Sequence, residues 1–216
     1  MDFDKKICIA GAGGFAREVL CCLIDKLESF NKKIEDVACF MVPDDSFSET
    51  KILGVEVIPQ SRFNPKYYNA VVAIGNPATR KRVVKSLPRE TKYVTIIHPS
   101  AIISKWVEIG TGTIITAGTI ITCNIKIGNH THLNLNTTIG HDCFLGDFFT
   151  TAPAVNVSGN CKFGECVYLG TNASVKEGIN VCNDVVIGMG SVVVKNIQEP
   201  GIYIGNPARK LEKNKD

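Results

Sequence analysis

The sequence predicts two joined parts: an α/β Rossmann-like half over residues 1–96, and an all-β left-handed parallel β-helix with a C-terminal tail over residues 97–216. Two observations predict this division. One aliphatic position recurs every six residues throughout the second part, and a glycine-rich turn follows a buried strand at the start of the first part. A chain of 216 residues accommodates two such small domains.

The six-residue repeat keeps one register throughout, and sixteen of its seventeen positions are apolar. Its members are Ile97, Ile103, Ile109, Ile115, Ile121, Ile127, Leu133, Ile139, Leu145, Thr151, Val157, Phe163, Leu169, Val175, Val181, Ile187 and Val193. A period of six fits neither an α-helix nor a single strand. It fits a chain that turns a corner every six residues, so that three short strands form one triangular coil. About five such coils are present.

Each coil is expected to stack its aliphatic residue on the one eighteen positions earlier, as in Ile109, Ile127 and Leu145. A single coil cannot bury its own interior, so stability comes from contacts between neighbours. Burial of each Ile or Leu contributes roughly 1.5–3 kcal/mol before entropy is counted. Glycine follows the aliphatic residue at several corners, where we expect it to supply freedom in φ. These glycines are Gly110, Gly128, Gly140, Gly146, Gly164, Gly170 and Gly188.

The first half opens with a strand, a glycine-rich turn and a helix. Residues 7–10 are apolar, residues 11–16 (GAGGFA) have the G-x-G-x-x-G/A form, and helical spacing follows over residues 17–30. Such a turn lets backbone N–H groups at a helix N-terminus approach a phosphate. We therefore expect Gly13, Gly14 and Phe15 to contact a substrate, the alternative being a tight turn without a ligand.

A second candidate loop follows the strand predicted over residues 70–74, at Gly75, Asn76 and Pro77. Ligands usually sit at the carboxyl ends of parallel strands, so Gly75 and Asn76 are also predicted to bind substrate. The unit spans only about ninety residues, enough for one mononucleotide half. The strand predicted over residues 37–42 ends in Val-Pro and lacks the acid that binds an NAD ribose, which disfavours NAD.

Composition excludes several classes of function. Twenty-four basic and 21 acidic residues leave a formal charge of +3, which argues against a nucleic-acid partner. No signal peptide and no apolar run long enough to span a bilayer are visible, so a cytoplasmic protein without a membrane partner is expected. The nine cysteines contain no CxxC pair, and no histidine completes a zinc spacing. We expect buried thiols and no metal site.

The repeat and the ending Gly205-Asn206-Pro207-Ala208-Arg209 resemble the hexapeptide-repeat acyltransferases, whose left-handed β-helices assemble as trimers. A nucleotide-binding half in front of the helix resembles, more narrowly, the bacterial acetyltransferases that act on amino-sugar nucleotides and on sialic acid. The resemblance implies that the N-terminal half holds a sugar nucleotide, that acetyl-CoA binds the helix as co-substrate, and that the protein is a homotrimer.

Residues 134–143 (NLNTTIGHDC) match the active-site coil of that group and contain the candidate base, His141. An imidazole, with an ordinary pKa of about 6.5, can accept a proton at neutral pH. Asp142 beside it can orient the ring and favour the imidazolium that forms. The alternative is that His141 merely occupies an outward corner. For His98, His130 and His132 a structural role is expected.

The resemblance also implies the remaining site residues. The backbone N–H of Gly159 is expected to stabilise the oxyanion, while Thr150, Thr171 and Met189 are expected to line the acetyl-CoA groove. Asn134 is expected to bind the acceptor sugar. Some relatives carry a histidine where this chain has Thr150, and a histidine often replaces Phe15. These departures bear on the identity of the substrate more than on the type of reaction.

The leading hypothesis is N-acetylation of a 4-amino sugar on a nucleotide carrier, for bacterial surface polysaccharide or glycan synthesis. O-acetylation of a sialic acid or a related sugar hydroxyl would use His141 in the same way. A non-catalytic β-helix scaffold or sugar-nucleotide sensor is a third hypothesis, against which the His141–Asp142 pair speaks. An NAD-dependent enzyme is a fourth hypothesis, and it is disfavoured because the chain has no second mononucleotide-binding half.

Overall fold

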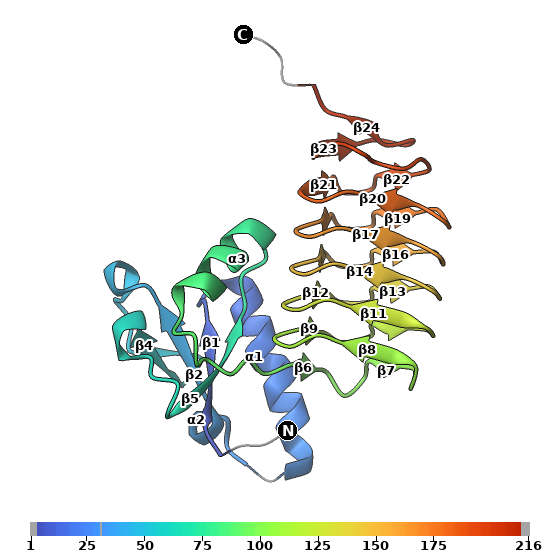
Figure 1. Cartoon of the computed structure of the whole chain (residues 1–216). Helices are drawn as coiled ribbons and strands as arrows, with labels where there is room; N and C mark the ends of the chain where they lie inside the picture. Colours follow the sequence, from blue (N-terminus) through green and yellow to red (C-terminus); the bar gives the residue numbers. More distant parts are fainter. Residues whose placement is uncertain (1–3, 31, 213–216) are drawn as a thin grey trace.

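The computed structural model describes residues 4–30 and 32–212 and shows an α/β part beside a column of stacked coils (Figure 1). The last residues of the expected tail, 213–216, lie outside the described residues. No helix in the described ranges is long and apolar enough to cross a membrane.

The α/β part contains a five-stranded sheet with the order β3-β4-β2-β1-β5. Its strands are β1 (Lys6–Ala10), β2 (Ala38–Val42), β3 (Lys51–Ile52), β4 (Val55–Pro59) and β5 (Tyr68–Val72). All neighbours are parallel except β3 and β4. The carboxyl ends of the adjacent strands β1 and β5 therefore lie side by side, and they lead into the two loops predicted to bind substrate.

Three α-helices cover the sheet: α1 (Gly14–Leu27), α2 (Ile34–Val37) and α3 (Pro77–Ser86). The short 3-10 helices of this part are η1 (Glu28–Phe30), η2 (Asp44–Ser46) and η3 (Gln60–Arg62). Helix α1 begins three residues earlier than the sequence spacing predicts, directly after Gly13. It lies on the side of the sheet that faces the β-helix (Figure 1), where it shares a core with Ile96 and Ile114 of the first coils. Two polar contacts reinforce this seam, from Lys26 Nζ to the Ile97 carbonyl and between His98 Nε2 and Asp25 Oδ2.

The β-helix has three faces, each a stack of short strands. The first face consists of β6 (Ile96–Ile97), β9 (Ile114–Ile115), β12 (His132–Leu133), β15 (Thr150–Thr151), β18 (Tyr168–Leu169), β21 (Val185–Ile187), β23 (Gly201–Ile204) and the antiparallel β24 (Arg209–Lys210). The second consists of β7 (Ile102–Ile103), β10 (Ile120–Ile121), β13 (Thr138–Ile139), β16 (Asn156–Val157), β19 (Ser174–Val175) and β22 (Val192–Val193). The third consists of β8 (Val107–Ile109), β11 (Ile125–Ile127), β14 (Phe144–Leu145), β17 (Lys162–Phe163) and β20 (Asn180–Val181).

The register confirms the repeat. Ile127 pairs with Leu145, and Ile139 pairs with Val157, each across eighteen residues. The exceptional Thr151 is fully buried, and its hydroxyl lies 2.7 Å from that of Thr137. A hydrogen bond between two buried threonine hydroxyls thus takes the place of an aliphatic contact. The architecture is the left-handed β-helix that the sequence predicts.

The explanation for the corner glycines was wrong. Positive φ occurs two positions later, at residues such as Asn136, Asp142 and Asn160, while the glycines directly after the aliphatic residue have ordinary φ. Those glycines are required by space, since a Cβ on Gly140 would lie 2.6 Å from the backbone nitrogen of Gly159. Close stacking of the coils excludes a side chain there.

Candidate active site

His141 and Asp142 occupy the corner between the second and third faces, directly after β13. Nδ1 of His141 lies 2.7 Å from Oδ2 of Asp142, and about half of the imidazole is exposed. Asp142 has φ of 60°, a conformation that aspartate tolerates and that turns its carboxylate towards the ring. The structure therefore brings the predicted base and its orienting acid into direct contact.

A third residue, Asn124, hydrogen-bonds to this pair, and it was not identified from the sequence as part of the site. Its Nδ2 donates a short hydrogen bond to Oδ1 of Asp142 from the corner one coil earlier. This bond, followed by the one from His141, holds the pKa of Asp142 below its ordinary value. The eighteen-residue offset from Asp142 was the available signal, because it places residue 124 on the same corner.

The charge of Asp142 fixes the protonation pattern of the ring. An ionised carboxylate only accepts hydrogen bonds, so Nδ1 of His141 carries the proton that it donates to Asp142. Nε2 is then left with a lone pair at the exposed edge of the ring. His141 is thereby arranged to accept a proton from a substrate through Nε2.

Gly159 lies beneath the His141 ring, one coil further on. A Cβ at this position would lie 2.5 Å from Cε1 and 2.6 Å from Nε2 of His141, so only glycine lets the ring rest there. Within the described ranges, the N–H of Gly159 has no hydrogen-bond partner. At the equivalent position on another corner, the N–H of Asn129 donates to Asp147 at 2.7 Å. The donor of Gly159 is thus free to meet an oxyanion beside the base.

A cavity of about 200 Å³ lies at the seam between the α/β part and the first face. It collects five of the residues that the sequence predicts for ligand binding, namely Phe15, Gly75, Asn134, Thr150 and Thr171. It extends from the first face to the corner between the first and second faces. His141 lies on the next corner of the same chain, so one chain does not bring the base and this cavity together.

The other predicted residues lie nearby but do not line the cavity. Gly13 and Gly14 face open space at the start of α1, with no atom within 4 Å of a Cβ built on either. The Asn76 side chain caps α3 by accepting the Thr79 N–H at 2.9 Å. Met189 is 80% exposed and stacks eighteen residues beyond Thr171 on the same corner.

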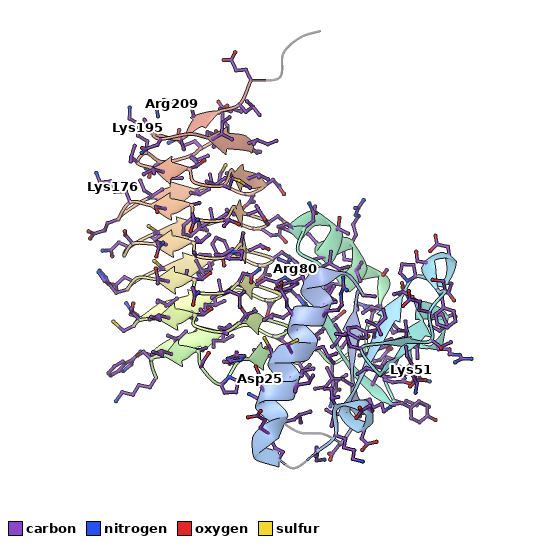
Figure 2. All side chains as sticks on the ribbon, turned by 180° about the vertical axis from the view of Figure 1, so that it is seen from behind. Asp25, Lys51, Arg80, Lys176, Lys195 and Arg209 are labelled. Carbon is purple, nitrogen blue, oxygen red and sulfur yellow. The ribbon has the colours of Figure 1, made fainter. Side chains whose placement is uncertain are left out.

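Arg80 of α3 is a second residue that the sequence did not single out, and it is fully buried at the seam (Figure 2). Its guanidinium donates to the Ile74 carbonyl at 2.7 Å, and to the Phe148 carbonyl and the Thr150 hydroxyl at 2.7 Å each. Burial lowers the pKa of Arg80 to about 9, so the group still carries its charge at neutral pH. It joins the loop after β5 to the wall of the cavity.

His132 and Phe15 form an aromatic contact across the seam, with ring centroids 4.9 Å apart. His132 is buried, and its burial, together with the nearby charge of Arg80, holds its pKa well below the ordinary value. It is therefore neutral and serves as a packing and hydrogen-bonding residue. Its ring also lines the cavity, so the structural role expected for it stays a prediction.

The N-terminal part matches a known family model. Residues 6–87 match the model described as PglD N-terminal domain. A GDP-perosamine N-acetyltransferase from Escherichia coli O157:H7 is 32% identical over 218 residues, covering 95% of this chain and 96% of that protein.

Solved structures of similar proteins cover nearly the whole chain. PerB from Caulobacter crescentus, in complex with CoA and GDP-perosamine, has 27% identity and a TM-score of 0.84 over 96% of this chain and 97% of that one. The acetyltransferase domain of PglB from Neisseria gonorrhoeae, in complex with acetyl coenzyme A, has 26% identity and a TM-score of 0.86 over 96% and 100%. WeeI from Acinetobacter baumannii has 29% identity and a TM-score of 0.86 over the same shares.

Proposed function

The chain belongs to the hexapeptide-repeat sugar N-acetyltransferases, and from this premise we propose that its acceptor is a 4-amino sugar carried on a nucleotide. It is an acetyl-CoA-dependent enzyme that acetylates the amino group of a nucleotide-linked amino sugar. The proposal of a 4-amino sugar rests on the near full-length match to a GDP-perosamine N-acetyltransferase. The product would serve bacterial surface polysaccharide or glycan synthesis. Its two small-molecule substrates are of the kind found in the cytoplasm, where we propose that the enzyme acts.

His141 is the proposed general base of the transfer. The neutral form of the sugar amine attacks the thioester carbonyl of acetyl-CoA, and Nε2 takes the proton that the amine nitrogen loses as the C–N bond forms. The new C–N bond forms an oxyanion that the Gly159 N–H stabilises, a contribution of roughly 3–4 kcal/mol for one such donor. Collapse breaks the C–S bond, and the imidazolium, stabilised by Asp142, returns a proton to the departing CoA thiolate. No covalent enzyme intermediate is required, because a thioester is already activated.

The two parts are proposed to divide the substrates between residues 1–96 and residues 97–216. The loops after β1 and β5 would hold the nucleotide, with Gly13 and Gly14 leaving the N-terminus of α1 open to a phosphate. Phe15, Gly75 and Asn76 continue this surface towards the β-helix, where Asn134 would meet the sugar. Thr150, Thr171 and Met189 would line the path of acetyl-CoA along the neighbouring coils.

A homotrimer is proposed because the base and the cavity occupy different corners of one chain. In a three-fold assembly of β-helices, the corner that carries His141 on one copy can face the cavity corner of the next copy. Light scattering should give three times the mass of the chain. Mixed refolding of His141→Ala with Asn134→Trp, which blocks the cavity, should restore activity that neither variant has alone. A monomeric mass, or no recovery on mixing, would refute the shared site.

The reaction is tested by thiol release from acetyl-CoA with a panel of acceptors. The panel contains GDP- and UDP-linked 4-amino sugars, the same nucleotides with 4-hydroxy sugars, and a sialic acid. Release with an amino sugar nucleotide, and none with its hydroxyl counterpart, is the expected result. Release with only a hydroxyl acceptor would favour O-acetylation. No release with any acceptor would favour the scaffold or sensor hypothesis.

A further inference from the structure

One hydrogen bond recurs at the corners of the β-helix with a constant offset of fifteen residues. A hydroxyl or thiol near the end of one corner donates to a backbone carbonyl at the start of the equivalent corner in the next coil. The pairs are Thr95 to Gly110 at 3.1 Å, Thr113 to Gly128 at 3.3 Å, Thr119 to Asn134 at 3.3 Å, Thr131 to Gly146 at 3.5 Å, Cys143 to Ser158 at 3.4 Å and Cys161 to Lys176 at 3.2 Å.

In the coil of the base, this donor position is filled by Cys143, two residues after His141. Its thiol is the sole hydrogen-bond partner of the Ser158 carbonyl among the residues that the structure describes. Cys143 is 3% exposed, so the Ser158 carbonyl points inward, towards the core of the helix.

The Ser158 carbonyl belongs to the same peptide unit as the Gly159 N–H. A trans peptide is planar, and its C=O and N–H point in opposite directions. An inward carbonyl therefore turns the Gly159 N–H outward, on the side where the His141 ring rests against Gly159. The thiol thus donates to the peptide unit that carries the donor proposed for the oxyanion.

We propose that Cys143 is a positioning residue for acetyl transfer, whose thiol holds the Ser158–Gly159 peptide so that the Gly159 N–H faces the reacting carbonyl. The proposal rests on the function proposed above. A nucleophilic role for Cys143 is disfavoured, because its contact with Cys161 and its burial raise the pKa of the thiol and keep it protonated. The thiol acts as a neutral donor, and it does not touch the substrate.

Two substitutions of nearly equal shape separate the hydrogen bond from packing. The same corner position holds Thr113 and Thr131 elsewhere, and it holds Val155 and Val167 in other coils, so both side chains fit the fold. Cys143→Val removes the donor, and kcat should fall about tenfold, the worth of one modest hydrogen bond. The KM values for acetyl-CoA and the sugar nucleotide, and the pH profile, should stay unchanged. Cys143→Thr should recover most of the lost rate.

Thr113→Val is the matched control. It removes the equivalent bond to the Gly128 carbonyl, and the N–H of that peptide unit, from Asn129, already donates to Asp147, so kcat should not change. Thermal unfolding checks that each variant is folded, and Cys143→Ala replaces the valine variant if that one is not.

Three results would overturn the inference. If Cys143→Val keeps the wild-type kcat, the thiol does not position the donor. If the threonine and valine variants lose equal rate, packing explains the loss. If the wild-type protein releases no CoA with any acceptor, the proposed function fails and takes this inference with it. An active wild type with an inactive His141→Ala variant keeps the two proposals distinguishable.

Discussion

Nη1 of Arg80 lies 3.0 Å from Nδ1 of His132, and this contact joins the two parts of the chain at a seam closed to solvent. Arg80 is otherwise surrounded by carbonyls and a hydroxyl, and no carboxylate among the described residues forms an ion pair with it. A buried guanidinium costs free energy unless its hydrogen bonds are made. The stability of the fold therefore depends on both parts of the chain holding the acceptors of Arg80 in place.

Replacing Arg80 should destabilise the fold. In Arg80→Met, the carbonyls of Ile74 and Phe148 and the Thr150 hydroxyl lose their donor, which should lower the free energy of unfolding by about 2–4 kcal/mol. Urea unfolding followed by circular dichroism measures the change. Arg82→Met is the matched control on α3: Arg82 makes an exposed bond to Thr79, so the expected loss is below about 0.5 kcal/mol. Equal losses in the two variants would contradict the role of Arg80.

The difference between Arg80 and the repeat shows what the sequence could predict. The column through Ile127 and Leu145 depends on an offset of eighteen residues that is visible in the sequence. Arg80 contacts residues that lie 52 to 70 positions away, in a part with a different period. No spacing connects these residues, so the sequence did not reveal that the Arg80 side chain is buried.

The same limit applies to the site. His141, Asp142 and Gly159 could be placed on one corner from the sequence, because the repeat register fixes corners. The register also offered Asn124, which was overlooked. The seam cavity could not be predicted, since Phe15 and Thr150 come together only through the packing of α1 and α3 against the first face.

Replacing His141, the proposed base, should abolish most of the transfer. His141→Ala leaves the coil backbone intact and should lower kcat by about 10²- to 10⁴-fold, the usual contribution of a positioned general base. CoA release at saturating substrate concentrations measures the rate, and light scattering checks that the variant has the same mass in solution as the wild type. A variant with most of the wild-type rate would show that His141 is not the base.

Loss of the orienting carboxylate should cost less. Asp142→Asn removes the charge that stabilises the imidazolium and fixes its tautomer, and kcat should fall about tenfold or more. Asn124→Ala leaves that charge in place and removes only the short bond to Asp142, so its effect should be smaller than that of Asp142→Asn. If both variants match the wild type in kcat, the acid has no orienting role.

Gly159→Ala should disturb the base without unfolding the coil. The new methyl group would collide with Cε1 and Nε2 of His141, which is the mobile end of an exposed side chain. The ring should swing away, and kcat should fall by about 10-fold or more while the melting temperature changes little. In the His141→Ala background the same substitution should lower the residual rate much less. Equal effects in the two backgrounds would mean that Gly159 acts independently of the ring.

Stability should decrease as the pH falls from neutrality, because His130 is buried in an apolar stack. Its ring lies edge-on to Tyr93 at 4.6 Å and stacks on Phe148 at 5.2 Å. Burial, and then the charge of Arg80, lower the pKa of His130 to about 4, while the nearby Asp147 opposes this shift.

The sign of the pH effect follows from proton binding. Between the folded value and the ordinary value of about 6.5, the unfolded chain binds more protons at this residue, so protons favour unfolding. The contribution is present in full above pH 6.5 and is lost as the pH falls towards 4, by about 2 kcal/mol at pH 5. His130→Leu, which keeps an apolar side chain in the stack, should flatten the decline in urea-unfolding free energy between pH 7 and pH 5. The remaining slope would include His132, whose pKa is lowered in the same direction, and a variant curve parallel to that of the wild type would contradict the assignment to His130.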